Sequence, residues 1–286
     1  MYVRTIERLG LGLGQPPRDP QSQQPALLKT FTSSVIAYKD SRGQCQSTKC
    51  LIYVPTKLRN QPKIDVLVFF HGLLDVCDNA HNFDPVKVAK RFRLDDQVEM
   101  AAQQATLVVP IILWNSEDRR SGIIRAAWSA AYLNALVEEV LAQINESSRV
   151  RPELERLILA GHSAAYDILT PLADQFDCGV QETKKGALAK LHKVLVMDTI
   201  YRTQDAKALE RWAGNLFWDA EFTLVLGNSV KADQPPAIWK RWIITRGKGE
   251  LPGNLKVLKT SDGHCELPGN YVRSFLEGRL PVAKAK

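Results

Sequence analysis

The segment most suggestive of chemistry is residues 161–165, GHSAA, which follows an apolar run of strand length and opens a helical pattern. A serine at a sharp strand-to-helix turn has strained backbone geometry, so it needs small residues two positions before and after it, here Gly161 and Ala165. The turn would lift the Ser163 hydroxyl above the sheet and place the Ala164 N–H at a helix N-terminus, where negative charge is favoured. The segment predicts a nucleophilic serine, although such short matches also occur in ordinary turns.

A second segment, VLVFFHGLL (66–74), is a buried strand that ends at His71 and Gly72. Gly72 allows a sharp turn after which the backbone amide of Leu73 can face a substrate oxygen. With the amide of Ala164 this provides two donors, the minimum for an oxyanion hole. We expect His71 and Gly72 to lie at the substrate-binding edge, with His71 capping or supporting the turn rather than acting as a catalyst.

The third segment, LKVLKTSDGHCEL (255–267), is a last strand followed by a loop that carries His264. A loop histidine beyond the last strand can act as a general base toward a serine at the carboxyl edge of the sheet. His81 and His192 lie away from the relevant strand ends, and the side chain of His162 is expected to point away from the turn. His264 is therefore the predicted base.

Together the three segments resemble the α/β-hydrolase superfamily, along nearly the whole chain from Phe31. The resemblance implies that Ser163 is the nucleophile and His264 the base. It also implies that the backbone amides of Leu73 and Ala164 bind the oxyanion. It identifies no substrate, because the same apparatus serves esterases, lipases, amidases, peptidases and acyltransferases.

The acid that should orient His264 has more than one candidate. Asp198 ends an apolar strand, so its carboxylate would emerge at the same sheet edge as the serine and the histidine. In the superfamily the acid more often follows the next strand, here 222–228, after which Asp233 is the first acidic residue. The strand-end position favours Asp198. Asp262 is close to His264 in sequence, and local pairing between them stays open.

Apolar runs of strand length alternate with helical patterns along most of the chain. The expected strands are 31–38, 50–55, 64–70, 105–112, 156–160, 193–198, 222–228 and 255–260. The expected helices are 84–92, with Asp84 as N-cap, and 128–144, 163–176, 205–213 and 271–278. The alternation predicts an α/β fold with a mainly parallel sheet flanked by helices, and the first two strands form an antiparallel hairpin at one edge. We expect a flexible arm over 1–26 and a single domain over 27–286.

Composition excludes several classes of protein. The 286 residues are 45% hydrophobic and 24% charged, as in globular domains, and the net charge of +7 is scattered, which argues against a nucleic-acid partner. The sequence contains neither an apolar stretch long enough to span a membrane nor a secretory signal pattern, so we expect a cytoplasmic protein.

The five cysteines lack the paired spacing of a structural zinc site, and we expect no metal. Cys45 and Cys50 could bridge a surface hairpin in an oxidising compartment. Cys265 lies next to His264, but adjacent residues rarely point the same way, so we expect no thiol catalysis.

The favoured hypothesis is a serine hydrolase that cleaves a carboxylic ester or related acyl bond of a small-molecule or polymer substrate through an acyl-enzyme, without a cofactor. An amidase or peptidase with the same residues is an alternative. A non-catalytic binding protein with this fold is another, although such proteins usually lose the nucleophile or the base. Net charge and the Cys45/Cys50 pair weakly suggest a secreted hydrolase of polymers. The short polar segment 177–191 is the longest candidate lid, which favours a soluble or polar substrate over a long-chain lipid.

Overall fold

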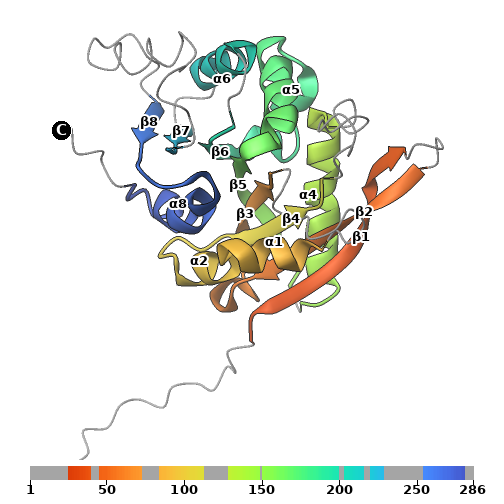
Figure 1. Ribbon diagram of the computed structural model, residues 1–286. Coiled ribbons are helices and arrows are strands. Elements are labelled where there is room, and N and C mark those ends of the chain that lie inside the picture. The colour runs from red at the N-terminus through yellow and green to blue at the C-terminus, as the bar shows by residue number, and fades with distance from the viewer. Residues whose placement is uncertain are drawn as a thin grey trace, which may run out of the picture.

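A computed structural model describes residues 25–39, 45–72, 84–112, 128–148, 150–199, 203–215, 220–228 and 254–280. They form an eight-stranded sheet in the order β1-β2-β4-β3-β5-β6-β7-β8 (Figure 1). The strands are β1 (Leu27–Lys39), β2 (Cys45–Val54), β3 (Lys63–Phe70), β4 (Thr106–Pro110), β5 (Glu153–His162), β6 (Leu191–Met197), β7 (Glu221–Leu226) and β8 (Leu255–Lys259). β2 pairs antiparallel with β1 and β4, and the other pairs are parallel. The predicted fold class is confirmed.

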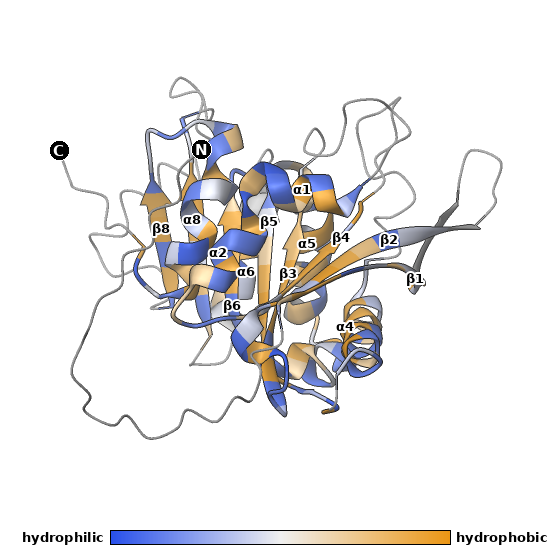
Figure 2. Cartoon of the chain, turned by 90° about the horizontal axis from the view of Figure 1, so that it is seen from below, coloured by the Kyte–Doolittle hydropathy of each residue, from blue (hydrophilic) through white to orange (hydrophobic). Residues whose placement is uncertain are grey.

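Helices cover both faces of the sheet (Figures 1 and 2). One face packs against α4 (Ala130–Asn145), α5 (Tyr166–Asp177) and α6 (Thr203–Asn215). The other packs against α1 (Pro85–Phe92), α2 (Leu94–Met100) and α8 (Leu267–Leu276). β3 shows how the sequence builds both layers, because Val68 and Phe70 join the first core while Leu67 and Phe69 join the second.

Local sequence signals explain most helix boundaries. The side chain of Asp84 accepts a hydrogen bond from the Val86 N–H at 2.9 Å and caps α1, as predicted. The short helix α2 was not predicted. It is separated from α1 by Arg93, whose φ of 51° lies in the left-handed region.

The first two strands are longer than expected, which decides the question of a Cys45–Cys50 disulfide. Both residues lie in β2, where five steps along an extended strand separate their Cα atoms by roughly 16 Å. A disulfide needs Cα atoms within about 7 Å. Cys50 is a free thiol, and burial, with Glu139 nearby, raises its pKa. The suggested bridge is therefore wrong.

The candidate lid at 177–191 also lies in a different place from the one expected. It connects the end of α5 to the start of β6, and its 3₁₀ turns Gln181–Lys184 and Leu188–Lys190 lie next to α4. This is the amino edge of the parallel strands, opposite to the edge where Ser163 lies, so the segment cannot cover the serine. Within the described part of the chain, no helix has the length and apolar character to cross a membrane.

Candidate active site

The predicted catalytic residues follow three parallel strands of the sheet, β5, β6 and β8. Ser163 comes directly after β5, Asp198 directly after β6, and His264 follows β8 by a short loop. Because β5 to β8 are parallel, their carboxyl ends share one edge of the sheet. The fold thus collects at one edge three residues that are far apart in sequence.

Ser163 begins a 3₁₀ turn, Ser163–Ala165, that leads into α5. Its φ is 54°, a left-handed conformation that costs a non-glycine residue about 1–3 kcal/mol and is characteristic of functional sites. A Cβ added to Gly161 would lie 2.5 Å from Leu169 Cδ1 and 3.1 Å from the Cβ of Ala165. A side chain at Gly161 would therefore collide with α5, because the end of β5 and the start of the helix approach closely.

His264 and Asp198 form a hydrogen-bonded pair in which the carboxylate is buried and the imidazole is partly exposed. The Nδ1 of His264 lies 3.0 Å from the Oδ2 of Asp198. The Asp198 side chain is 3% exposed and that of His264 is 26% exposed. An ionised carboxylate only accepts hydrogen bonds, so Nδ1 carries the proton and Nε2 keeps its lone pair. The pairing leaves one ring nitrogen able to accept a proton.

The carboxylate of Asp198 is held from a second side. Its Oδ1 accepts a hydrogen bond from the Gly227 N–H at 2.7 Å. Its own N–H donates to the Val225 carbonyl at 3.0 Å, and its φ is 46°, a second left-handed residue at this edge. Gly227 was not predicted as a site residue.

His162 differs from its prediction. Its ring points toward the His264 loop, not away from the site: Nε2 donates to the His264 carbonyl at 2.9 Å, and the two ring centroids are 4.5 Å apart. The Phe92 ring meets it edge-on at 5.6 Å. The alternation of β5 explains this orientation, because His162 shares the face of Ala160, which packs against the α1 and α8 side. That side also carries the His264 loop.

His71 is fully buried between the ends of β3 and β4. Its Nε2 accepts the Ile112 N–H at 2.8 Å, so Nδ1 carries the proton and donates to the Gly72 carbonyl at 2.8 Å. A ring used in this way supports the backbone of the turn, and its burial places it away from solvent-borne substrate. Leu73, Asp233 and His81 lie outside the described residues.

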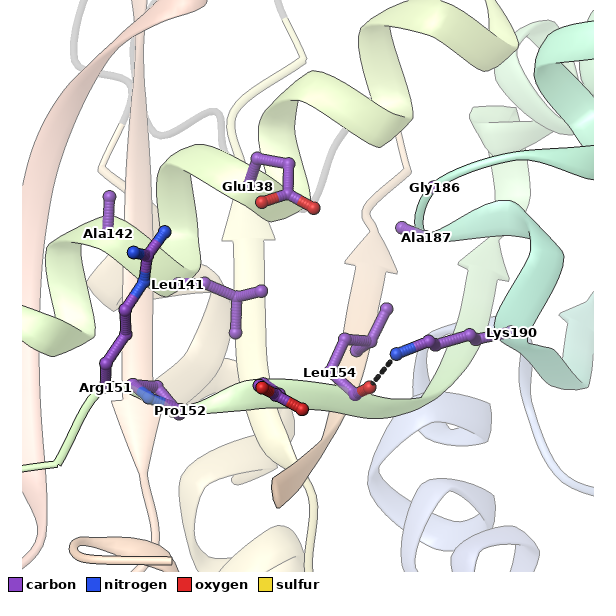
Figure 3. Close-up of a pocket in the computed structure, with 10 residues that line it drawn as sticks. Glu138, Leu141, Ala142, Arg151, Pro152, Leu154, Gly186, Ala187 and Lys190 are labelled. Atoms are coloured by element: carbon purple, nitrogen blue, oxygen red, sulfur yellow. Dashed lines mark hydrogen bonds between the residues drawn. The ribbon is translucent and has the colours of Figure 1, made fainter. Parts of the chain in front are cut away.

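A hollow of about 480 Å³ lies at the opposite edge of the sheet, around the start of β5 (Figure 3). Its walls carry charges of both signs, from Glu138, Arg151, Glu153 and Lys190. Because β5 runs from Glu153 to His162, this hollow and Ser163 lie at its two ends. In the part of the chain that the structure describes, no group of three or more His, Cys, Asp or Glu residues could hold a metal ion.

A scan against models of protein families finds no match, and a search of curated proteins finds none either. Solved structures do resemble it. An S-formylglutathione hydrolase from Staphylococcus aureus is 10% identical with a TM-score of 0.48, over 90% of this chain and 98% of the other. Another from Agrobacterium tumefaciens is 12% identical with a TM-score of 0.48, over 89% and 94%. The BES protein from Bacillus cereus is 11% identical with a TM-score of 0.47, over 96% and 97%.

The chain has the α/β-hydrolase fold. Its own strand order, with β1 and β2 antiparallel at one edge and β3 to β8 parallel, carries this assignment. The left-handed serine between β5 and α5 is the local feature expected of that fold.

Proposed function

We propose that this protein is a serine hydrolase that cleaves a carboxylic ester or a related acyl bond, with Ser163 as nucleophile, His264 as general base and Asp198 as the acid. The observation that carries the proposal is the 3.0 Å contact between His264 Nδ1 and Asp198 Oδ2 at the edge where Ser163 follows β5. Such a pair fixes the tautomer of the imidazole and stabilises the imidazolium that forms during attack.

In the proposed reaction, the Ser163 hydroxyl oxygen attacks the substrate carbonyl carbon while His264 Nε2 takes the hydroxyl proton. The tetrahedral intermediate collapses, the imidazolium protonates the leaving group, and an acyl-enzyme remains on Ser163. Water then repeats the two steps, with His264 taking a proton from water and returning one to the serine oxygen. The acid is released and the enzyme is restored.

The oxyanion of the intermediate needs backbone donors. The N–H of Ala164 follows the nucleophile at the start of the turn into α5, where the helix dipole favours negative charge. The amide of Leu73, directly after His71 and Gly72, is the second proposed donor. The hydrogen bonds of His71 to Ile112 and Gly72 support the backbone that leads to it.

Asp198 is preferred to the other two candidate acids. Asp262 has its own partner, because its Oδ2 accepts a hydrogen bond from Asn270 Nδ2 at 3.1 Å. It is Asp198 that contacts the His264 ring. Asp233 remains the alternative acid, and the Asp198→Asn variant discussed below distinguishes them.

The test compares Ser163→Ala with a matched control, Ser47→Ala, at an exposed position of β2. We expect Ser163→Ala to lower hydrolysis of short p-nitrophenyl esters by at least about 10³-fold and to abolish labelling by a fluorophosphonate probe. Ser47→Ala should change neither. Unchanged ester turnover in folded Ser163→Ala protein would falsify the proposal. Wild-type protein that no probe labels and that hydrolyses no ester, amide or peptide of a graded panel would instead be a non-catalytic binding protein.

A further inference from the structure

Gly227 is the first residue after β7, beside the end of β6 that carries Asp198. Its N–H donates to Asp198 Oδ1 at 2.7 Å, a short hydrogen bond of the kind formed with an ionised acceptor. The other oxygen, Oδ2, is the one that faces His264 Nδ1. The two oxygens of the carboxylate therefore contact different groups, Oδ1 the Gly227 amide and Oδ2 the imidazole.

The space around Gly227 admits no side chain. A Cβ built there would lie 2.7 Å from Asp198 Oδ2, 3.0 Å from the Asp262 carbonyl oxygen and 3.1 Å from Leu267 Cδ1. Contacts under 3.0 Å with a Cβ essentially do not occur, so something has to move. The nearest atom is the oxygen that pairs with the base.

The neighbours of Gly227 are not free to move away. The backbone of Asp198 is held by its N–H to the Val225 carbonyl at 3.0 Å. The Asp262 carbonyl accepts the Asn228 N–H at 2.9 Å, which ties the β8 loop to the end of β7. The least restrained response to a Cβ is rotation of the Asp198 carboxylate, which breaks its contact with His264.

We propose that Gly227 is a positioning residue for the catalytic acid, acting through both its amide and its lack of a side chain. The inference rests on the proposed function. Its amide stabilises the ionised carboxylate and fixes which oxygen faces the imidazole. Its missing Cβ leaves room for that orientation. Through Asp198, Gly227 sets how strongly the enzyme stabilises the imidazolium form of His264.

The test is Gly227→Ala, with Gly269→Ala as the matched control. Gly269 lies in α8, and a Cβ there would come no closer than 3.8 Å to Phe92 O, so alanine fits. We expect Gly227→Ala to lower kcat for a short ester about tenfold to a hundredfold with KM changed less than about twofold. The acid limb of the kcat/KM–pH profile should move to lower pH, because a displaced carboxylate stabilises the imidazolium less. Gly269→Ala should change none of these.

A double-mutant cycle separates positioning from a general structural effect. In an Asp198→Asn background, Gly227→Ala should cost less than about threefold, because the carboxylate it positions is already gone. If the two losses multiply, or if Gly227→Ala leaves kcat and the pH profile unchanged, the inference is overturned.

A measurement on the unreacted protein covers the case in which Gly227→Ala does not fold. With ¹⁵N-labelled glycine, the Gly227 amide proton should resonate downfield in the wild type and move upfield, with faster exchange, in Asp198→Ala. No movement overturns the inference. This readout needs no turnover, so it is separate from the proposed function, which fails if Ser163→Ala remains active.

Discussion

Two buried carboxylates lie at opposite ends of the parallel strands, Asp198 at the carboxyl end and Asp65 near the amino end. Each pairs with a basic side chain. Both residues are 5% exposed. Asp65 lies near the start of β3, where Arg156 of β5 contacts it with Nε to Oδ1 at 3.0 Å and Nη2 to Oδ2 at 2.8 Å. Gln103 Nε2 adds a third hydrogen bond at 3.0 Å. Asp198 has instead one oxygen on a backbone amide and the other on an imidazole.

The difference lies in what each partner can do with a proton. Hydrogen bonding to Asp65 raises the pKa of Arg156 further above its already high value, so the guanidinium keeps its proton at all relevant pH. It is a fixed tie between β3 and β5. The partner of Asp198 is a histidine, whose imidazole can accept and donate a proton during a reaction, as a guanidinium cannot. The same acid type is therefore a structural clamp at one edge and, in the proposed mechanism, the support for proton transfer at the other.

The largest expected effect comes from removing the charge at the carboxyl edge. Asp198→Asn should lower kcat/KM for a short ester by about 10³–10⁴-fold, because an amide neither fixes the productive tautomer nor stabilises the imidazolium. The matched change at the other edge, Asp65→Asn, should leave kcat/KM within about twofold. Steady-state kinetics on both variants measures this contrast. Equal losses in the two would remove the functional distinction, and an active Asp198→Asn would make Asp233 the better candidate acid.

The second effect concerns stability, and here we expect Asp65→Asn to be more damaging than Asp198→Asn. Asp65→Asn should lower the free energy of unfolding by about 2 kcal/mol, because it breaks a bidentate pair whose carboxylate is buried. The loss is smaller than for a fully buried pair, since the Arg156 side chain is 39% exposed. Urea unfolding monitored by circular dichroism measures it. Asp198→Asn should lower the free energy of unfolding by less, since the side-chain oxygen of the new asparagine can still accept the hydrogen bond from the Gly227 N–H. A larger stability loss for Asp198→Asn than for Asp65→Asn would mean that the carboxyl-edge pair is structural too.

A third, smaller effect concerns His162, which supports the His264 loop by one hydrogen bond and one ring contact. His162→Phe keeps an aromatic ring but loses the donor to the His264 carbonyl. We expect kcat to fall about threefold to thirtyfold while KM changes little, because His264 is less well placed. His192→Phe is the control, a histidine of β6 away from the site. An unchanged kcat in His162→Phe would show that the ring contact alone holds the loop.

Much of the fold was predictable, because apolar runs and their spacing depend on local chemistry. The placement of Ser163, Asp198 and His264 at one edge was predictable for the same reason, since each follows a strand whose carboxyl end lies at that edge. The contacts of Gly227 and His162 were not predictable in this way. They depend on how closely two chain segments approach, and no single segment encodes that distance. The extent of β2 was also missed, since polar residues 45–49 show no strand-like apolar pattern, and their pairing with β1 decides it.

The smallest expected effect concerns His192 at the start of β6, which lies within reach of the charges of the Asp65–Arg156 clamp. Burial lowers the pKa of His192 below its ordinary value of 6.5, and the positive charges of Arg156 and Lys193 lower it further, against a smaller opposing effect of Asp65 and Glu221. The unfolded chain therefore binds a proton more readily than the native protein as pH falls below about 6.5, so this group makes the folded state lose stability in that range. Replacing His192 with Gln removes the titration and should reduce the drop in urea midpoint between pH 7 and pH 5. If the variant and the wild type lose stability equally over that range, neither burial nor the charges of Arg156 and Lys193 lower the pKa of His192, and the clamp has no effect on this histidine.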